Sequence, residues 1–361
     1  MSLHVEAAFA ALTDAGVEAA DVDGVVCAYS LVEPQIMLAA AFVEFSGLRP
    51  QVAMTISNAG VTAAMMVMQA AMLIEQGYCK HVLVVAGDNR LSGLRGRASG
   101  VIAASGTHAQ FEYPYGATVP AAYALIANRY MHEYGVAADA LAAIPVTQRR
   151  HASLHPLAHK RTLITLEDVL ASRMIASPLR RLDCCPNSDG GAALLISAAD
   201  AAADARRPGI SILGAGQGTT HEYLVGAPSL TEFGCKMSAR QAFARAGVEP
   251  KDIDVAEIYD SFTITLAVEL ESMGFFDKGA CGAAAAAGDL AIGGRLPCNT
   301  HGGLLSYGHS GAAGGLFHFV EAVDQLRGDA GARQVADAEL AFVHGDGGIL
   351  AAHCSVILGR I

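Results

Sequence analysis

The sequence predicts an α/β protein made of two similar halves, each built on a mostly parallel sheet. Short apolar strands alternate with Ala-rich helices, and this order typically gives a parallel sheet covered on both faces. Hydrophobic residues make up 52% of the 361 residues and charged residues only 16%, so much of the chain must be buried. Segments 15–26 and 246–258 repeat each other, which predicts that the fold is duplicated.

The repeat joins a helix to a strand in both copies. "AGVEAADVDGVV" follows one Ala-rich amphipathic helix, and "AGVEPKDIDVAEI" follows another. We expect Gly16 and Gly247 to end these helices, because glycine adopts the left-handed conformation that a helix C-terminus often needs. A second pair, "SDGGAALLIS" and "GDGGILAAHC", recurs in the same order. The halves are therefore expected over residues 1–200 and 208–361.

Within the halves, the individual elements follow from apolar runs and their flanking residues. A buried helix is expected over 61–76 and a buried strand over 80–89, and another strand over 207–219 opens the second half. Residues 100–185 break this alternation and are expected to form an insertion packed over one edge of the core. Helices are expected in this insertion near 119–133, 137–152 and 165–172.

Composition excludes several classes of protein. The net charge is −11 and no Lys/Arg cluster is present, which argues against nucleic acid as the main partner. The longest apolar run, 63–74, is too short for the roughly 20 residues of a membrane span. No signal peptide precedes the first helix, so we expect a cytoplasmic protein. The eight cysteines form no CxxC pair, so no metal is expected in this chain.

The glycine-rich stretch "NTHGGLLSYGHSGAAGG", 299–315, is the first candidate site. Its glycines would let the backbone approach a bound ligand closely. The stretch leads into an amphipathic helix, whose N-terminus offers free N–H groups and partial positive charge. His309 would lie just before that helix as a neutral hydrogen-bond donor to developing negative charge. The alternative is a histidine that only holds the loop, and the case for a role of His301 is weaker.

These motifs resemble those of the thiolase superfamily over essentially the whole chain. The glycine-rich stretch is similar to the family's "NPSGG…GHPxGATG". "EIYDSFT", 257–263, stands where the sterol carrier protein thiolase branch carries "HDCF". The resemblance implies a duplicated five-layered α-β-α-β-α core with a loop-domain insertion, a coenzyme A thioester as substrate, and a homodimer. The family begins with a strand before the first helix, so we expect the true N-terminus upstream of Met1.

The nucleophile of the family is absent. Where those thiolases carry a cysteine at the start of a buried helix, this sequence has Gly60, and glycine cannot form an acyl-enzyme. The acid/base cysteine of "HDCF" becomes Ser261, and its histidine becomes Tyr259. An acyltransferase of the acetyl-CoA acetyltransferase type would need a relocated nucleophile, for which Cys298 and Cys185 are the candidates.

Enolate chemistry without covalent attachment remains available. The predicted reaction is retro-aldol cleavage of a β-hydroxyacyl-CoA in steroid or lipid side-chain breakdown, with Tyr259, Tyr307 and His344 as proton-transfer groups and His309 holding the enolate. Thiolase-like proteins of bacterial steroid side-chain breakdown, which the sequence resembles, lack the cysteine and work with a small partner that carries an OB-fold and a zinc ribbon. The alternative is a catalytically silent subunit that binds acyl-CoA or lipid.

Two further groups of residues complete the expected site. Backbone contacts to the thioester are expected at Gly308, Gly311 and Gly347. The CoA phosphates would meet Arg149, Arg150 and His151, although this basic run could equally be a solvated helix face.

Overall fold

The chain folds around two four-stranded sheets. The computed structural model describes residues 1–95, 100, 106–202 and 206–360. The first sheet has the order β2-β1-β3-β6, with β1 Gly24–Ala28, β2 Val52–Ile56, β3 His81–Asn89 and β6 Asp189–Ser197. The second has the order β7-β10-β9-β8, with β7 Ile210–Thr219, β8 Val255–Ile258, β9 Leu340–Gly347 and β10 Ala352–Arg360.

Strand direction is mixed, and the expectation of mostly parallel sheets is wrong for the second sheet. β1 pairs in parallel with β2 and β3, whereas β6 runs antiparallel to β3. In the second sheet only β8 and β9 are parallel, because β10 runs antiparallel to both β9 and β7. The turn between β9 and β10 spans only residues 348–351, and so short a connection can join only antiparallel neighbours.

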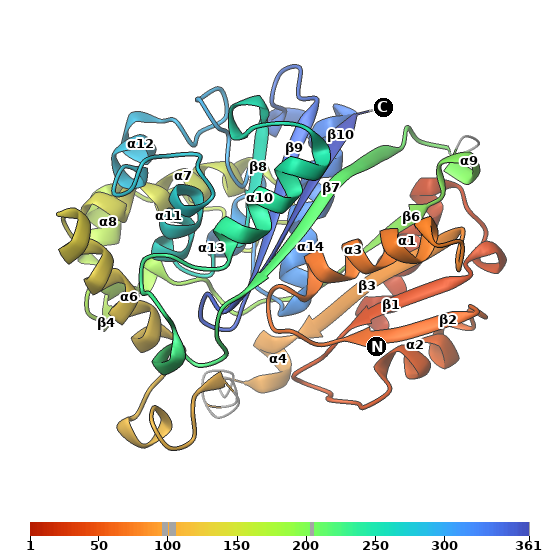
Figure 1. Cartoon of the computed structure of the whole chain (residues 1–361), viewed down its shortest axis with the longest axis horizontal. Helices are drawn as coiled ribbons and strands as arrows, with labels where there is room; N and C mark the ends of the chain where they lie inside the picture. The colour runs from red at the N-terminus through yellow and green to blue at the C-terminus, as the bar shows by residue number, and fades with distance from the viewer. Residues whose placement is uncertain (96–99, 101–105, 203–205, 361) are drawn as a thin grey trace.

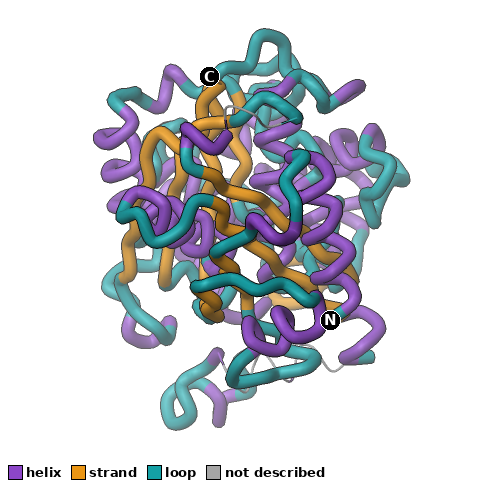
Figure 2. Tube along the Cα trace, turned by 90° about the vertical axis from the view of Figure 1, so that its right-hand side faces the viewer, coloured by secondary structure: helices purple, strands orange, loops and turns teal. Residues whose placement is uncertain are grey.

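Helices and sheets alternate in five layers (Figure 1). α1 Ser2–Ala15 and α2 Leu38–Ser46 cover the outer face of the first sheet. α3 Thr62–Glu75 and α14 Ala312–Arg327 lie between the two sheets and share one core with both. α10 Cys235–Ala246 covers the outer face of the second sheet, with α11 Thr263–Ser272 in the same core. The strands accordingly run through the middle of the molecule with helices on either side (Figure 2).

The sequence repeat corresponds to a structural repeat. Gly16 ends α1 at φ 72° and Gly247 ends α10 at φ 71°, so both helices stop as expected. Asp23 accepts hydrogen bonds from the N–H groups of Lys80 and His81 at the start of β3. Asp254 does the same for the start of β9. Asp23 therefore fixes the register of β1 against β3, and Asp254 fixes that of β8 against β9.

The remaining elements connect and cover this core. Between β3 and the insertion lies α4 Arg90–Leu94, and the described part of the insertion contains η2 Tyr113–Tyr115, α6 Val119–Tyr134, η3 Ala140–Ala142, α7 Ala143–Leu154, α8 Leu166–Ala171, β4 Met174–Ala176, β5 Leu179–Arg180 and η4 Arg181–Asp183. Elsewhere they are η1 Ala19–Asp21, α9 Ala199–Ala202, η5 Leu224–Gly226, η6 Pro250–Asp252, α12 Cys281–Ala287, α13 Gly303–Ser306 and η7 Gly331–Arg333. Among the described residues, no helix is both long and apolar enough to cross a membrane.

Candidate active site

Two predicted residues, Tyr259 and His309, meet between the sheets. Tyr259 follows the last residue of β8, and its N–H donates to the carbonyl oxygen of His344 on β9. His309 lies two residues before the N-cap of α14, and its carbonyl oxygen accepts from the N–H of Ser188. The Tyr259 hydroxyl lies 2.7 Å from Nε2 of His309, so a proton can pass directly between them.

Gly60 lies against this pair and leaves room for it. A Cβ atom at position 60 would overlap the hydroxyl of Tyr259 and the carbonyl oxygen of Asp346. The tyrosine ring therefore fills the space that a nucleophilic side chain at the start of α3 would need. Glycine at position 60 and tyrosine at position 259 depend on each other sterically, and a cysteine does not fit beside this tyrosine.

Burial keeps both members of the pair neutral. Burial, together with the charge of Arg90, lowers the pKa of His309 to about 3, so its imidazole is neutral at physiological pH. Burial raises the pKa of the Tyr259 hydroxyl well above its usual 10, while the charge of Arg90 opposes that rise. A neutral imidazole at this position was expected from the α14 dipole, and burial favours the same neutral form.

Arg90 is a site residue that the sequence motifs did not reveal. It follows β3 directly and is only 4% exposed, with Nε 3.6 Å from a carboxylate oxygen of Asp88. Its guanidinium lies 2.8 Å from where a Cβ atom of Gly311 would be, which explains glycine at that N-cap of α14. A single arginine at a strand end carries no pattern, so only the fold shows that it faces Tyr259 and His309.

Tyr307 takes part in a different group of rings. Its ring packs edge-on against His155, His301 and Phe317, with centroids 4.8–5.0 Å apart. Burial raises the pKa of its hydroxyl to about 12. The structure therefore places Tyr307 among aromatic neighbours rather than in the hydrogen bond between Tyr259 and His309.

His344 points away from that hydrogen bond. Its ring lies on the α10 side of the second sheet, where Nδ1 contacts Ser355 Oγ at 2.9 Å. The next residue, Gly345, faces Val61 and Ala64 of α3 instead. Because successive residues of a strand face opposite sides, the structure does not bring His344 to Tyr259.

The two residues after Tyr259 have structural contacts. Asp260 is fully buried and accepts from the N–H groups of Leu304 and Leu305, so it caps α13 rather than the helix that follows it in the chain. Burial raises the pKa of Asp260 to about 8. The carbonyl oxygen of Ser261 accepts from the N–H of Cys185. The Ser261 hydroxyl lies 3.4 Å from the Thr265 hydroxyl.

The two cysteines considered as relocated nucleophiles are poorly suited to that role. Burial raises the pKa of Cys298 well above its usual value, and it raises that of Cys185 as well. Only the thiolate attacks a thioester, and burial disfavours it. The structure thus argues against an acyl-enzyme at either position.

Two of the three residues expected to meet the CoA phosphates face the interior. Arg149 donates to the Ser306 hydroxyl and to the Thr162 carbonyl oxygen and is 8% exposed. His151 is 1% exposed and lies within hydrogen-bonding distance of the Asn299 carbonyl oxygen and the Ile292 N–H. Arg149 and His151 hold α7 against the glycine-rich stretch, and only Arg150 of the three is exposed.

Close packing explains the other two glycines of the expected site. A Cβ atom at Gly308, which has φ 146°, would lie 2.7 Å from Ser188 Oγ. One at Gly347 would lie 2.6 Å from the Asn58 carbonyl oxygen. Both glycines bring loops of the two halves together, and Gly347 does so next to Gly60.

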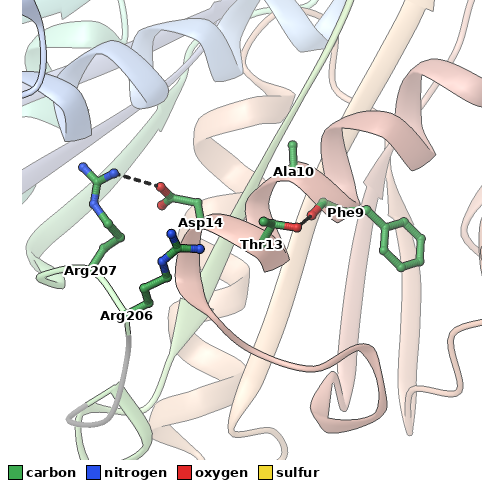
Figure 3. Close-up of a pocket in the computed structure, with 6 residues that line it drawn as sticks. All are labelled: Phe9, Ala10, Thr13, Asp14, Arg206 and Arg207. Carbon is green, nitrogen blue, oxygen red and sulfur yellow. Dashed lines mark hydrogen bonds and ion pairs between the residues drawn. The ribbon is translucent and has the colours of Figure 1, made fainter.

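A separate hollow lies on the surface near α1 (Figure 3). Its polar lining is dominated by Asp14 and Arg207, which pair with each other. Asp14 also pairs with Arg327, and Arg207 with Asp329. The hollow is lined by Phe9, Ala10, Thr13, Asp14, Arg206 and Arg207, none of which belongs to the site around Tyr259.

A duplicated five-layered core, with its site at the start of the two inner helices, defines the thiolase fold class. A family model described as thiolase C-terminal domain-like matches residues 216–360. A steroid side-chain-cleaving aldolase of Thermomonospora curvata is 36% identical over 344 residues, covering 91% of this chain and 85% of that protein. An acetyl-CoA acetyltransferase of Methanothermobacter thermautotrophicus is 33% identical over 355 residues, covering 96% and 92%.

A solved structure agrees with these relatives. That of the Ltp2-ChsH2(DUF35) aldolase matches with a TM-score of 0.88 at 33% identity, covering 99% of this chain and 92% of that chain. The chain belongs to the thiolase superfamily, in its sterol carrier protein thiolase-like branch.

Proposed function

We propose that this protein is a CoA-thioester lyase that cleaves the Cα–Cβ bond of a β-hydroxyacyl-CoA by a retro-aldol reaction. One observation carries the proposal: the Tyr259 hydroxyl occupies the space of the missing nucleophile and lies 2.7 Å from His309 Nε2. Acyl transfer needs an attacking side chain at that place, whereas retro-aldol cleavage needs a proton acceptor there. The similarity to a steroid side-chain-cleaving aldolase supports the same reaction.

The proposed steps use the neutral pair as a relay. The β-hydroxyl of the substrate gives its proton to the Tyr259 oxygen while Tyr259 passes its own proton to His309 Nε2. The Cα–Cβ electrons move into the thioester as an enolate, and a ketone or aldehyde leaves. The imidazolium then balances the enolate charge until the proton returns through Tyr259 to Cα. Because the transfers are concerted, no free phenolate forms in a buried site that disfavours it.

Arg90 and the start of α14 would stabilise the negative charge. The buried guanidinium of Arg90 lies beside Gly311, which is the N-cap of α14. Free N–H groups at a helix N-terminus and a buried cation both favour an enolate oxygen over a neutral carbonyl. We also propose that a small OB-fold and zinc-ribbon partner completes the enzyme, since the Ltp2-ChsH2(DUF35) aldolase pairs two chains.

A cleavage assay tests the proposal. A β-hydroxyacyl-CoA is incubated with the protein, with and without such a partner, and the released acyl-CoA and carbonyl compound are separated by chromatography. Tyr259→Phe removes only the hydroxyl and should lower the cleavage rate about 10²–10⁴-fold while CoA binding persists. Tyr307→Phe is the matched control and should change the rate far less.

Two outcomes would contradict the proposal. CoA binding without cleavage under either condition would mean a silent acyl-CoA-binding subunit. A covalent acyl adduct, seen by intact-protein mass spectrometry after incubation with acetyl-CoA, would restore acyl transfer.

A further inference from the structure

A second buried cluster lies one layer behind the site, on the outer face of the second sheet. It consists of Glu269 on α11, His344 on β9 and His353 on β10. These side chains are at most 1% exposed. Nε2 of His344 lies 3.1 Å from Nδ1 of His353, and Glu269 Oε1 lies 3.4 and 3.6 Å from these two nitrogens.

The hydrogen bonds around the histidines fix where their protons are. His353 Nε2 lies 3.0 Å from the Leu350 carbonyl oxygen, which can only accept, so Nε2 carries the hydrogen and Nδ1 has a lone pair. The Ser238 hydroxyl donates to the Cys235 carbonyl oxygen, and the Ser355 hydroxyl must therefore donate to Ser238 Oγ, 2.9 Å away. Ser355 Oγ then accepts from His344 Nδ1, which leaves a lone pair on His344 Nε2.

Three electron-rich atoms thus face one buried point, and none of the surrounding hydrogen bonds places a hydrogen there. Neither carboxylate oxygen of Glu269 makes a hydrogen bond in the described structure. Uncompensated, such an arrangement is strongly unfavourable in a protein interior, since a buried carboxylate needs a charged or hydrogen-bonding partner.

We propose that Glu269, His344 and His353 form a structural binding site for a divalent zinc ion. Zinc at its usual 2.0–2.1 Å from nitrogen and oxygen ligands, in tetrahedral geometry, separates those ligands by roughly 3.3–3.4 Å. The observed separations of 3.1, 3.4 and 3.6 Å match that spacing. The second oxygen of Glu269 also lacks a hydrogen bond and can approach the ion at the narrower angle of a bidentate carboxylate. The outer ring nitrogens already have the partners that orient metal-bound histidines.

The cluster around Glu257 has similar composition but different hydrogen bonding. Glu257 Oε1 accepts from the N–H and hydroxyl of Thr300. Oε2 lies 2.9 Å from His301 Nδ1 and 3.2 Å from His318 Nδ1. These histidines lower the pKa of Glu257 to about 2, and Glu257 raises the pKa of His301, so charge pairing within this group is favoured. This cluster therefore needs no ion and provides a matched control.

The zinc would fix α11 to the β9–β10 hairpin. α11 begins four residues after Tyr259, and β9 carries the Asp346 carbonyl oxygen that faces Gly60. Glu269 lies 75 residues before His344 in the chain, and none of the three ligands is a cysteine, which is why the absence of a CxxC pair led to the expectation of no metal. Because the point is buried, the ion would enter as the chain folds.

Metal analysis of the full chain, purified without its partner and with any tag removed, tests the site. We expect about one zinc per chain by inductively coupled plasma mass spectrometry. Protein unfolded with a chelator and refolded with Zn²⁺ should melt at a higher temperature than protein refolded without it. Refolding with Co²⁺ should give the visible absorption of tetrahedral cobalt.

Variants locate the ion. Glu269→Gln and His353→Gln should reduce zinc to about a tenth of the wild-type content, whereas the control His318→Gln should retain it. If the ligand variants do not fold, the wild-type measurements decide alone. Wild-type protein with no zinc, no cobalt absorption and no rise in melting temperature would overturn the proposal, as would full zinc content in a folded Glu269→Gln variant.

Discussion

At the scale of single residues, the steric dependence between Gly60 and Tyr259 decides which chemistry is possible. Gly60→Cys restores the family nucleophile in sequence, but its Cβ atom would overlap the Tyr259 hydroxyl and the Asp346 carbonyl oxygen. We expect this variant to displace Tyr259 and to lose at least about 10²-fold in cleavage rate without gaining an acyl adduct. Cleavage kinetics and intact-protein mass spectrometry check both statements.

The matched control for Gly60 is Gly226→Ala, because a Cβ atom at Gly226 meets nothing within 4 Å. It should leave the rate unchanged. An active Gly60→Ala variant would show that the Tyr259 ring moves freely, and the steric argument would then fail.

The low pKa of His309 predicts how stability depends on pH. A histidine in the unfolded chain titrates near pH 6.5, whereas folded His309 titrates near pH 3. Between these values the unfolded state binds more protons, so this contribution to stability is present above pH 6.5 and is lost as pH falls towards 3. His309→Gln should therefore reduce the stability lost between pH 7 and pH 5 by about 2 kcal/mol, as measured by urea unfolding. An identical pH dependence in both proteins would contradict the assigned pKa.

At the scale of elements, a buried ion pair anchors α14, which carries the site at its other end. Nε and Nη2 of Arg333 donate to the two carboxylate oxygens of Glu321. Arg333→Met would leave the Glu321 carboxylate unpaired in the interior, and we expect a loss of about 3–5 kcal/mol in the free energy of unfolding. The exposed pair Arg129 and Glu133 is the control, where Arg129→Met should cost about 0.5 kcal/mol or less. Equal losses in chemical denaturation would contradict this account.

Elements with a strong apolar pattern could be predicted from the sequence, and their contacts could not. The helix expected over 61–76 is α3, and the strand expected over 80–89 is β3. The helix expected over 137–152 instead begins with the 3₁₀ turn Ala140–Ala142 and continues as α7 to Leu154. Apolar spacing marks a helix well, but it does not distinguish a tight first turn from an α-helical one.

The candidate site was only partly predictable, for a reason of geometry. A motif fixes position along the chain, and this was enough to name Tyr259 and His309 as candidate site residues, but not to predict the contact between them. Which face of β9 carries His344 depends on strand register, and a shift of one residue reverses the answer. Arg90 belongs to no motif and reaches the site only because β3 ends beside α14. The fold was therefore needed to add Arg90 to the site and to separate His344 from it.

At the scale of the whole molecule, the site needs both halves of the chain. Gly60 and Arg90 come from the first half, whereas Tyr259 and His309 come from the second. The inner helices α3 and α14 start at this junction, and the two sheets hold them from outside. The second half alone carries the relay, but neither half alone forms the whole site, which accounts for the tight glycine contacts where their loops meet.

The first sheet also offers an edge for a second copy of the chain. Among the described strands, β2 pairs only with β1, and exposed apolar side chains lie on the neighbouring α2 and its N-cap, where Phe45 is 64% and Met37 69% exposed. Two β2 strands related by a two-fold axis would join both first sheets and cover these side chains, which is the homodimer we expect.

Light scattering after gel filtration should give about twice the chain mass of 37.2 kDa. Ala53→Lys places a charge on the exposed edge and should shift the protein to monomers. Leu125→Lys changes an exposed side chain on α6 and should leave the dimer intact. A dimer that survives Ala53→Lys would place the interface elsewhere.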